Sequence, residues 1–154
     1  MRLYLVRHGE AKSAEEDPAR SLTDRGRRDV EKVAAFLRPL GLCVSAVWHS
    51  GKARAIQTAE ILAAALAPPA PLLRREGLAP TDPVEPVAEE IAGLFGDLMI
   101  VGHMPFVGRL ASLLVIGRDV PEVAAFRAGG ALCLEGGGQE PWRVGWMIVP
   151  DILP

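Results

Sequence analysis

The sequence predicts an α/β fold in which short buried strands alternate with amphipathic helices. Two wholly apolar strands are expected, over residues 3–6 and 98–101, and each is followed by a turn that contains glycine and histidine. Between them, a third apolar stretch at 44–49 leads within two residues into a helical pattern. Strands that alternate with helices in this way build a mostly parallel sheet.

The first strand delivers a cluster of functional residue types at its end. Leu3–Val6 is followed directly by Arg7, His8 and Gly9. In open α/β sheets, ligands bind just outside the carboxyl ends of the strands, so Arg7 and His8 are candidate site residues. Gly9 lacks a Cβ atom and lets the backbone turn sharply and approach a ligand. The polar segment 11–21 is then expected to be an active-site loop.

A helix follows this loop. Thr23 is a suitable N-cap, and Pro39 ends the helical pattern. The apolar stripe of the helix consists of Val30, Val33, Ala34 and Leu37. These spacings place one apolar face against the sheet.

The second strand–helix unit brings another cation to the same edge. Val44–His49 predicts a core strand, and Ser50 is expected to N-cap a helix over 52–62. Arg54 then lies in the first turns of this helix, within reach of the crevice that holds Arg7. His49 at the strand end is interpreted as structural.

The second half of the chain repeats the pattern after an irregular segment. Residues 67–86 carry most of the prolines and predict an irregular connection, with Leu72 and Leu73 as a short edge strand. A helix is expected over 87–95, and strand 98–101 then delivers Gly102 and His103. Pro105 suits the first position of a helix through Leu114. The tail, 129–149, predicts a closing hairpin of 131–134 and 144–149 around Gly136–Gly138.

Composition limits the class of protein. A length of 154 residues fits one domain over 1–154, with 49% hydrophobic and 23% charged residues. A net charge of −2 argues against a nucleic-acid partner. Prolines interrupt the longest apolar region, 61–73, and the N-terminus lacks a signal-peptide core, so no membrane association and a cytoplasmic location are expected. Cys43 and Cys133 are expected to be buried thiols.

Three strands therefore bring Arg7, His8, Arg54 and His103 to one end of the sheet. Arginine binds phosphate through bidentate hydrogen bonds, so this cationic pocket suits a tetrahedral phosphoryl group. The glycine-rich loops of nucleotide-binding proteins are absent. His8 is our candidate nucleophile, because nearby arginine charges favour the neutral imidazole. Arg7, Arg54 and His103 would stabilise the charge of the transition state.

Three motifs together resemble a known family. They are Leu-Val-Arg-His-Gly-Glu at residues 5–10, Ser50…Arg54-Ala55…Gln57-Thr58-Ala59, and Val101-Gly102-His103…Pro105. They are similar to those of the histidine phosphatase superfamily, and the short length is most like its SixA-type phosphohistidine phosphatases. The resemblance implies a single-domain, three-layer α/β/α sandwich of the phosphoglycerate-mutase-like kind, without large insertions. It also implies a phosphohistidine intermediate on His8, phosphate binding by Arg7, His8, Gly9, Arg54 and His103, and no metal or organic cofactor.

The proton donor is the least defined part of the predicted site. Larger members of the family place a glutamate in the middle segment to protonate an alkoxide leaving group. Glu76 is our candidate for this acid, and Asp82 lies in the same region. Phosphoramidates need less acid assistance, because an imidazole leaves readily once it is protonated. A weak acid would therefore favour phosphohistidine in a protein over sugar phosphates.

The same residues are also compatible with other functions. Within the enzyme class, the alternative is a phosphatase of small phosphate monoesters. Two histidines and Glu10 are also compatible with a metallohydrolase, although no close His-x-His spacing occurs. A phosphate- or phosphoprotein-binding module without turnover is a third alternative. Lys12 and Arg20 on the loop are candidates for steering an anionic substrate. The chain is expected to be a monomer or a homodimer.

Overall fold

Six strands form one mixed sheet in the computed structural model, which describes residues 1–154. Their order in the sheet is β3-β2-β4-β1-β5-β6. The strands are β1 (Arg2–Arg7), β2 (Ala46–His49), β3 (Leu72–Arg74), β4 (Leu98–Gly102), β5 (Ala131–Gly137) and β6 (Glu140–Ile148). The first four strands in this order are parallel, and β5 and β6 are antiparallel to their neighbours. The predicted mostly parallel sheet with a closing hairpin is confirmed.

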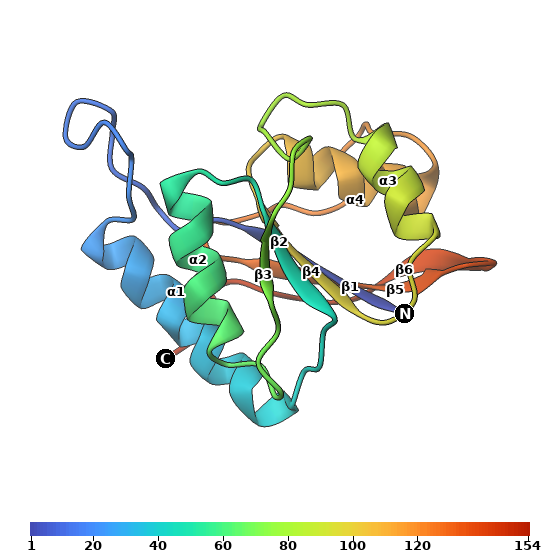
Figure 1. Cartoon of the computed structure of the whole chain (residues 1–154), viewed down its shortest axis with the longest axis horizontal. Coiled ribbons are helices and arrows are strands. Elements are labelled where there is room, and N and C mark those ends of the chain that lie inside the picture. The colour runs from blue at the N-terminus through green and yellow to red at the C-terminus, as the bar shows by residue number, and fades with distance from the viewer.

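Helices cover both faces of the sheet, as Figure 1 shows. They are α1 (Asp24–Leu37), α2 (Ala53–Ala63), α3 (Glu85–Ala92) and α4 (Phe106–Ile116), with 3₁₀ turns η1 (Arg38–Leu40) and η2 (Pro150–Ile152). Helices α1 and α2 lie on one face, and α3 and α4 lie on the other. This is the expected three-layer α/β/α sandwich. None of the helices is long and apolar enough to span a membrane.

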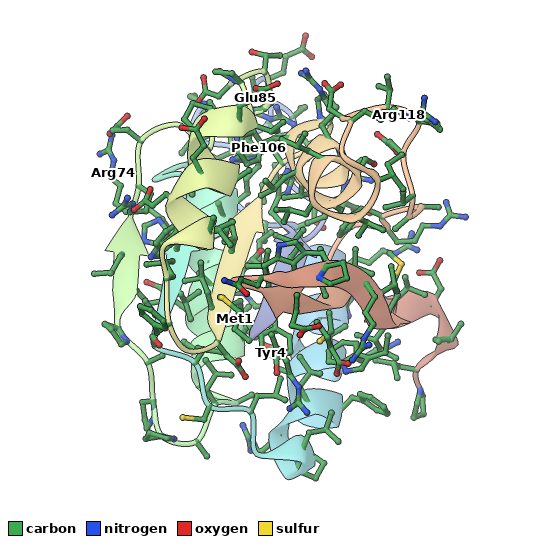
Figure 2. All side chains as sticks on the ribbon, turned by 90° about the vertical axis from the view of Figure 1, so that its right-hand side faces the viewer. Met1, Tyr4, Arg74, Glu85, Phe106 and Arg118 are labelled. Carbon is green, nitrogen blue, oxygen red and sulfur yellow. The ribbon has the colours of Figure 1, made fainter.

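The two faces of β1 belong to two separate apolar cores. Tyr4 and Val6 pack with α1 and α2, whereas Leu3 and Leu5 pack with α3 and α4. Successive side chains of a strand point to opposite faces, so a central strand covered on both sides must be apolar throughout. Figure 2 labels Tyr4 of one core and Phe106, at the start of α4, of the other. This double burial fits the position of β1 in the interior of the sheet.

The register aligns the ends of the parallel strands. Arg7 on β1 pairs with Gly102 on β4, and His49 on β2 pairs with Val101. The amide of His8 then donates to the carbonyl of Gly102 at 2.9 Å. The residues that follow β1, β2 and β4 therefore emerge together at one edge of the sheet.

Several predicted boundaries need correction. Helix α3 begins at Glu85 rather than 87, since Pro86 suits the first helical turn, and it ends at Ala92. Pro105 immediately precedes α4 instead of opening it. The hairpin strands are longer than expected and extend into the glycine run.

Cys133 is buried, as predicted, but Cys43 is exposed. Residues 42–46 alternate between buried and exposed as the chain approaches β2, and Cys43 falls on the exposed side. Leu42 and Val44 are buried, but successive side chains of an extended segment point to opposite sides, so their burial does not extend to Cys43.

Candidate active site

Three strand ends supply the polar side chains of the candidate site. His8 follows β1, Ser50 follows β2, and His103 follows β4. The rings of His8 and His103 lie 4.9 Å apart between centroids, at an interplanar angle of 57°. The Oγ atom of Ser50 lies 2.6 Å from Nε2 of His103. Residues separated by 42 to 95 positions in the chain thus form one contact cluster.

Two arginines contribute positive charge that no carboxylate neutralises. Arg54 lies in the first turn of α2 and is only 9% exposed. Arg7 donates from Nη1 to the carbonyl of Phe126 at 3.1 Å. Neither guanidinium takes part in an ion pair. A buried cation without a counterion is costly, so this arrangement favours binding of an anion.

Three buried side-chain nitrogen atoms of this cluster have no hydrogen-bond partner in the protein. They are Nε of Arg7, Nε of Arg54 and Nδ1 of His103. No other buried side-chain nitrogen or oxygen in the chain is left without a partner. Each unsatisfied buried polar group costs about 1–3 kcal/mol, and native proteins contain few. Their restriction to this cluster indicates a site built for an acceptor-rich ligand.

The ring of His8 is held as a neutral base. Its Nδ1 atom lies 2.7 Å from the carbonyl oxygen of Gly9, so Nδ1 carries the proton and Nε2 keeps a free lone pair. Burial above all, together with the charges of Arg54 and Arg7 and against the opposing effect of the Gly9 carbonyl, lowers the pKa of His8 to about 4. The imidazole is therefore unprotonated at neutral pH and available as a nucleophile.

His103 is also neutral. Burial, followed by the nearby His8 and Arg54, lowers its pKa to about 3. The side chain is 1% exposed and contacts Ser50. A neutral imidazole carries a proton on only one of its two nitrogens. The hydrogen bond between Ser50 and Nε2 therefore affects which nitrogen of His103 carries the proton.

One face of helix α2 forms hydrogen bonds to the segments around Gly9 and Leu22. Thr58, four residues after Arg54, accepts a hydrogen bond from the amide of Gly9 at 3.0 Å and donates to the carbonyl of Arg54 at 2.8 Å. Gln57 accepts from the amide of Leu22 at 2.7 Å. Residues three and four apart share a helix face, which explains the spacing of the Arg54…Gln57-Thr58 motif.

Gly9 is required by close packing. A Cβ atom at Gly9 would lie 2.8 Å from Val30 of α1. At Gly26, in the first turn of α1, it would lie 2.1 Å from the carbonyl oxygen of Glu10. The turn after β1 therefore sits directly against the N-terminus of α1. Thr23 caps this helix by accepting from the amide of Gly26 at 2.9 Å, as predicted.

The predicted active-site loop, residues 11–21, projects beyond the sandwich in Figure 1. Its base is closed by a bridge between Ala11 and Leu22. Arg20 adopts a left-handed backbone conformation (φ 51°), and its Nε donates to the carbonyl of Lys12 at 3.1 Å. The charge of Arg20 contributes to the lowered pKa values of His8 and His103, after burial and the closer groups. The loop thus adds positive charge near the cluster.

The carboxylate of Glu10 forms no hydrogen bond or ion pair with His8 or His103. It is exposed and accepts from the hydroxyl of Thr23 at 3.0 Å, at the N-terminus of α1. A negative charge is favourable at that position of a helix.

The two candidate acids lie outside the contact cluster. Glu76, which follows β3, has a side chain that is 91% exposed and pairs with Arg74 at 3.4 Å. Asp82 accepts from the amide of Ala79 at 2.8 Å and closes a local turn. No hydrogen bond or ion pair connects either carboxylate to Arg7, His8, Arg54 or His103. The role of Glu76 stays a prediction.

His49 and the potential for metal binding also bear on the site. His49 is buried and accepts from the amide of Gly51 at 3.2 Å, which is a structural contact. Burial, with a smaller effect of Arg74, lowers its pKa. Nowhere in the chain do three His, Cys, Asp or Glu side chains gather closely enough to hold a metal ion.

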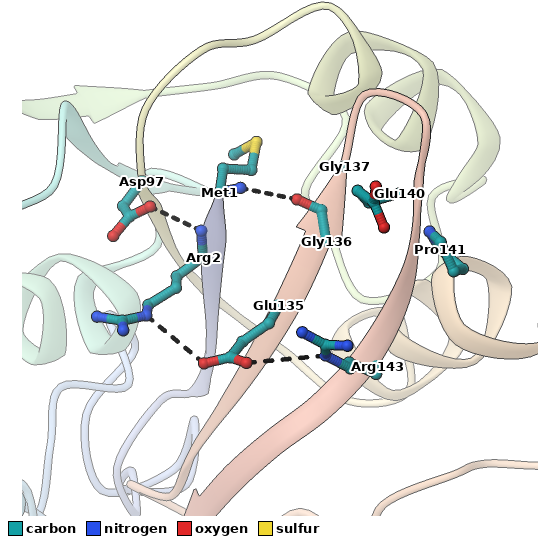
Figure 3. Close-up of a pocket in the computed structure, with 9 residues that line it drawn as sticks. All are labelled: Met1, Arg2, Asp97, Glu135, Gly136, Gly137, Glu140, Pro141 and Arg143. Carbon is teal, nitrogen blue, oxygen red and sulfur yellow. Dashed lines mark hydrogen bonds and ion pairs between the residues drawn. The ribbon is translucent and has the colours of Figure 1, made fainter.

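A cavity lies at the start of β1, at the end of that strand away from His8, and Figure 3 shows its lining. It measures about 510 Å³ and surrounds Met1 and the start of β1. Within it, Glu135 pairs with Arg2 at 3.6 Å and with Arg143 at 3.9 Å. The terminal ammonium donates to the carbonyl of Gly136 at 2.8 Å. The two arginines of this cavity are thus paired with a carboxylate, unlike Arg7 and Arg54.

Comparison with known proteins identifies the family. The family model "Histidine phosphatase superfamily (branch 1)" matches residues 3–82. An uncharacterised protein of Picosynechococcus is 35% identical over 136 residues, which cover 84% of this chain and 82% of that protein. The chain belongs to the histidine phosphatase superfamily. As a member of this superfamily it is a phosphatase.

Solved structures of the superfamily share the fold. The protein histidine phosphatase SixA complexed with tungstate matches with a TM-score of 0.86 at 24% identity, covering 98% of each chain. A candidate α-ribazole-5'-P phosphatase from Escherichia coli matches with a TM-score of 0.74 at 18% identity, covering 97% of this chain and 98% of the other. This histidine phosphatase therefore has the phosphoglycerate-mutase-like fold at the minimal size of SixA.

Sequence reasoning missed the roles of Ser50 and Thr58. Ser50 does not cap α2: the helix begins at Ala53, and no side chain caps it. Ser50 contacts His103 instead, and its distance to the amide of Lys52 is a long 3.4 Å. A serine between a strand and a helix gives the same sequence pattern whether it caps the helix or contacts a side chain elsewhere. Its position directly after a strand, like that of His8, was the available signal.

Proposed function

We propose that this histidine phosphatase hydrolyses phosphohistidine in a protein substrate, with His8 as the nucleophile. The proposal rests on one observation above all. Two guanidiniums without a counterion, each with an unsatisfied Nε–H donor, and the unpartnered Nδ1 atom of His103 surround a neutral imidazole whose Nε2 lone pair is free. A tetrahedral phosphoryl group offers the acceptors that these donors lack. The tungstate bound to the SixA of similar fold is a tetrahedral oxyanion of the same shape.

The reaction proceeds in two displacements. Nε2 of His8 attacks the phosphorus atom, and the bond from phosphorus to the substrate imidazole breaks as that imidazole takes up a proton. Water then attacks the phosphoryl group on His8, the P–Nε2 bond breaks, and inorganic phosphate leaves. Arg7, Arg54 and His103 hold the equatorial oxygens through both steps and stabilise their charge.

The surroundings of Glu76 favour a phosphoramidate over an ester. An alkoxide leaving group has a high proton affinity and needs a positioned acid, whereas an imidazole leaves readily once protonated. The side chain of Glu76 is 91% exposed and pairs with Arg74 rather than with a site residue. A phosphatase of small phosphate monoesters is the second candidate, supported by the fold shared with the α-ribazole-5'-P phosphatase candidate.

The test compares turnover of a phosphohistidine protein, a small phosphoramidate and common sugar phosphates. We expect the phosphohistidine protein to be hydrolysed most efficiently and Glu76→Gln to change this rate less than about threefold. His8→Ala should lower phosphate release by at least about 1,000-fold while tungstate binding persists. Efficient sugar-phosphate hydrolysis that collapses in Glu76→Gln would instead establish the second candidate.

Two further outcomes separate this proposal from the other classes. Unchanged activity in EDTA is expected, and loss of activity that a divalent ion restores would indicate a metallohydrolase. Tungstate binding without turnover of any phosphorylated compound would indicate a phosphate-binding module.

A further inference from the structure

The contact between Ser50 and His103 joins the ends of β2 and β4. Its length of 2.6 Å between Oγ and Nε2 is short for a hydroxyl–imidazole hydrogen bond. Either group is able to donate in principle, because a neutral imidazole has one protonated and one bare nitrogen. The direction of this bond decides which nitrogen of His103 carries the proton.

The other contacts of the Ser50 hydroxyl indicate the direction. A hydroxyl has one proton to donate and two lone pairs to accept with. The amide of Lys52 points at a lone pair of Oγ, at 3.4 Å. The only acceptor that Oγ contacts is Nε2 of His103. If Nε2 carried the proton instead, the hydroxyl proton would have no acceptor in the protein.

The second nitrogen of His103 is consistent with this direction. Nδ1 is buried and has no protein partner, which leaves it free for a ligand. The ring is neutral, since burial lowers its pKa to about 3, so a proton on Nδ1 excludes one on Nε2. His8 shows the complementary arrangement: its Nδ1 proton is held by the carbonyl of Gly9, and Nε2 is bare.

We propose that Ser50 is a positioning residue that donates to Nε2 of His103 and thereby holds its proton on Nδ1, where it is donated to a phosphoryl oxygen. The two histidines thus carry opposite functions because two different neighbours fix their tautomers. One presents a lone pair to phosphorus, and the other presents a proton to oxygen. This inference rests on the proposed function, because it assigns the Nδ1 proton to the bound phosphoryl group.

The tautomer is directly observable by ¹⁵N NMR. The chain has only three histidines, so two-bond ¹H–¹⁵N correlations of ¹⁵N-histidine-labelled protein give three ring patterns. His49→Gln assigns His49 by difference. We expect His103 in the Nδ1–H form in the free protein and with tungstate bound, and a population of the Nε2–H form in Ser50→Ala. An Nε2–H ring, or a doubly protonated ring in the tungstate complex, would overturn the proposal.

Kinetics give the second readout. Ser50→Ala should lower kcat by about 10- to 100-fold, the usual cost of losing an orienting neighbour of a functional histidine, while Ser50→Thr restores most of the rate. Ser112→Ala is the control for loss of a serine hydroxyl, because Ser112 is fully buried but bonds only to Gly108 and Val123 and not to a histidine. A rate in Ser50→Ala equal to that of the parent, with folding confirmed by circular dichroism, would refute a positioning role.

The two proposals fail in different ways. If no phosphorylated compound is hydrolysed but His103 remains in the Nδ1–H form with tungstate, the proposed function fails and the tautomer assignment stands. If phosphohistidine is hydrolysed but Ser50→Ala leaves both the tautomer and kcat unchanged, the assignment to Ser50 fails alone.

Discussion

The hydroxyl of Thr58 accepts a hydrogen bond from the amide of Gly9 at 3.0 Å, which connects α2 to the turn that carries His8. Thr58 is completely buried and donates in turn to the carbonyl of Arg54 at 2.8 Å. One hydroxyl therefore fixes the turn that carries His8 relative to α2, which carries the buried Arg54. The relative positions of His8 and Arg54 therefore depend on the Thr58 side chain.

Thr58→Val tests this connection. The substitution keeps the shape but leaves the buried amide of Gly9 without a partner, at a cost of about 1–3 kcal/mol in the free energy of unfolding. The rate should fall as well, because the turn after β1 is less well held. Urea denaturation and phosphate release measure the two effects. Thr58→Ser, which keeps the hydroxyl, is expected to stay close to the parent in both, and equal losses in Ser and Val would contradict this role.

Arg54→Met should separate stability from function. The substitution removes a buried, unpaired cation, so the thermal midpoint in an anion-free buffer should rise. Tungstate affinity should fall by about 10- to 100-fold, since a charge-assisted hydrogen bond contributes about 1.5–3 kcal/mol. Differential scanning fluorimetry and calorimetric titration provide the measurements. Arg28→Met on the exposed side of α1 is the control. A thermal midpoint of Arg54→Met below that of the parent would contradict the prediction, because it would show that other groups of the protein already compensate the charge of Arg54.

Acidification should destabilise the protein through its histidines. His8 and His103 have folded-state pKa values of about 4 and about 3, below the ordinary value of 6.5. At pH values between 6.5 and about 4, both histidines bind protons in the unfolded chain but not in the folded chain. The free energy of unfolding therefore declines as the pH falls from 6.5 towards 4. Denaturation at several pH values between 7 and 5 measures the slope. His8→Gln should flatten it, and an unchanged slope in that variant would mean that His8 titrates normally.

Gly26→Ala should prevent α1 from docking on the turn after β1. Its Cβ would lie 2.1 Å from the backbone oxygen of Glu10, and backbone atoms cannot move aside cheaply. We expect a large loss of thermal stability, with phosphatase activity falling with it. Gly93→Ala at the end of α3 is the control, because the nearest atom to its Cβ would be 3.6 Å away. Normal stability in Gly26→Ala would show that α1 does not pack here as described.

Local sequence patterns were sufficient to locate Arg7, His8 and His103. Each follows a short, wholly apolar strand, and the direction of parallel strands places such residues at one edge. Arg54 could be located because its helix starts directly after β2. The chain around Glu76 lacks this regularity: the short edge strand β3 interrupts an irregular, proline-rich connection, so neither strand direction nor helix face predicts where its carboxylate points.

The sequence by itself determined the family, the order of strands and helices, and the four charged or imidazole side chains delivered to one edge, because apolar runs and turns are local properties. Only the tertiary structure decided which groups those side chains meet. Ser50 bonds to a histidine 53 positions away, and Thr58 bonds to an amide 49 positions away. Such contacts arise when the parallel register brings separate strand ends to the same level, and no short stretch of sequence contains that information.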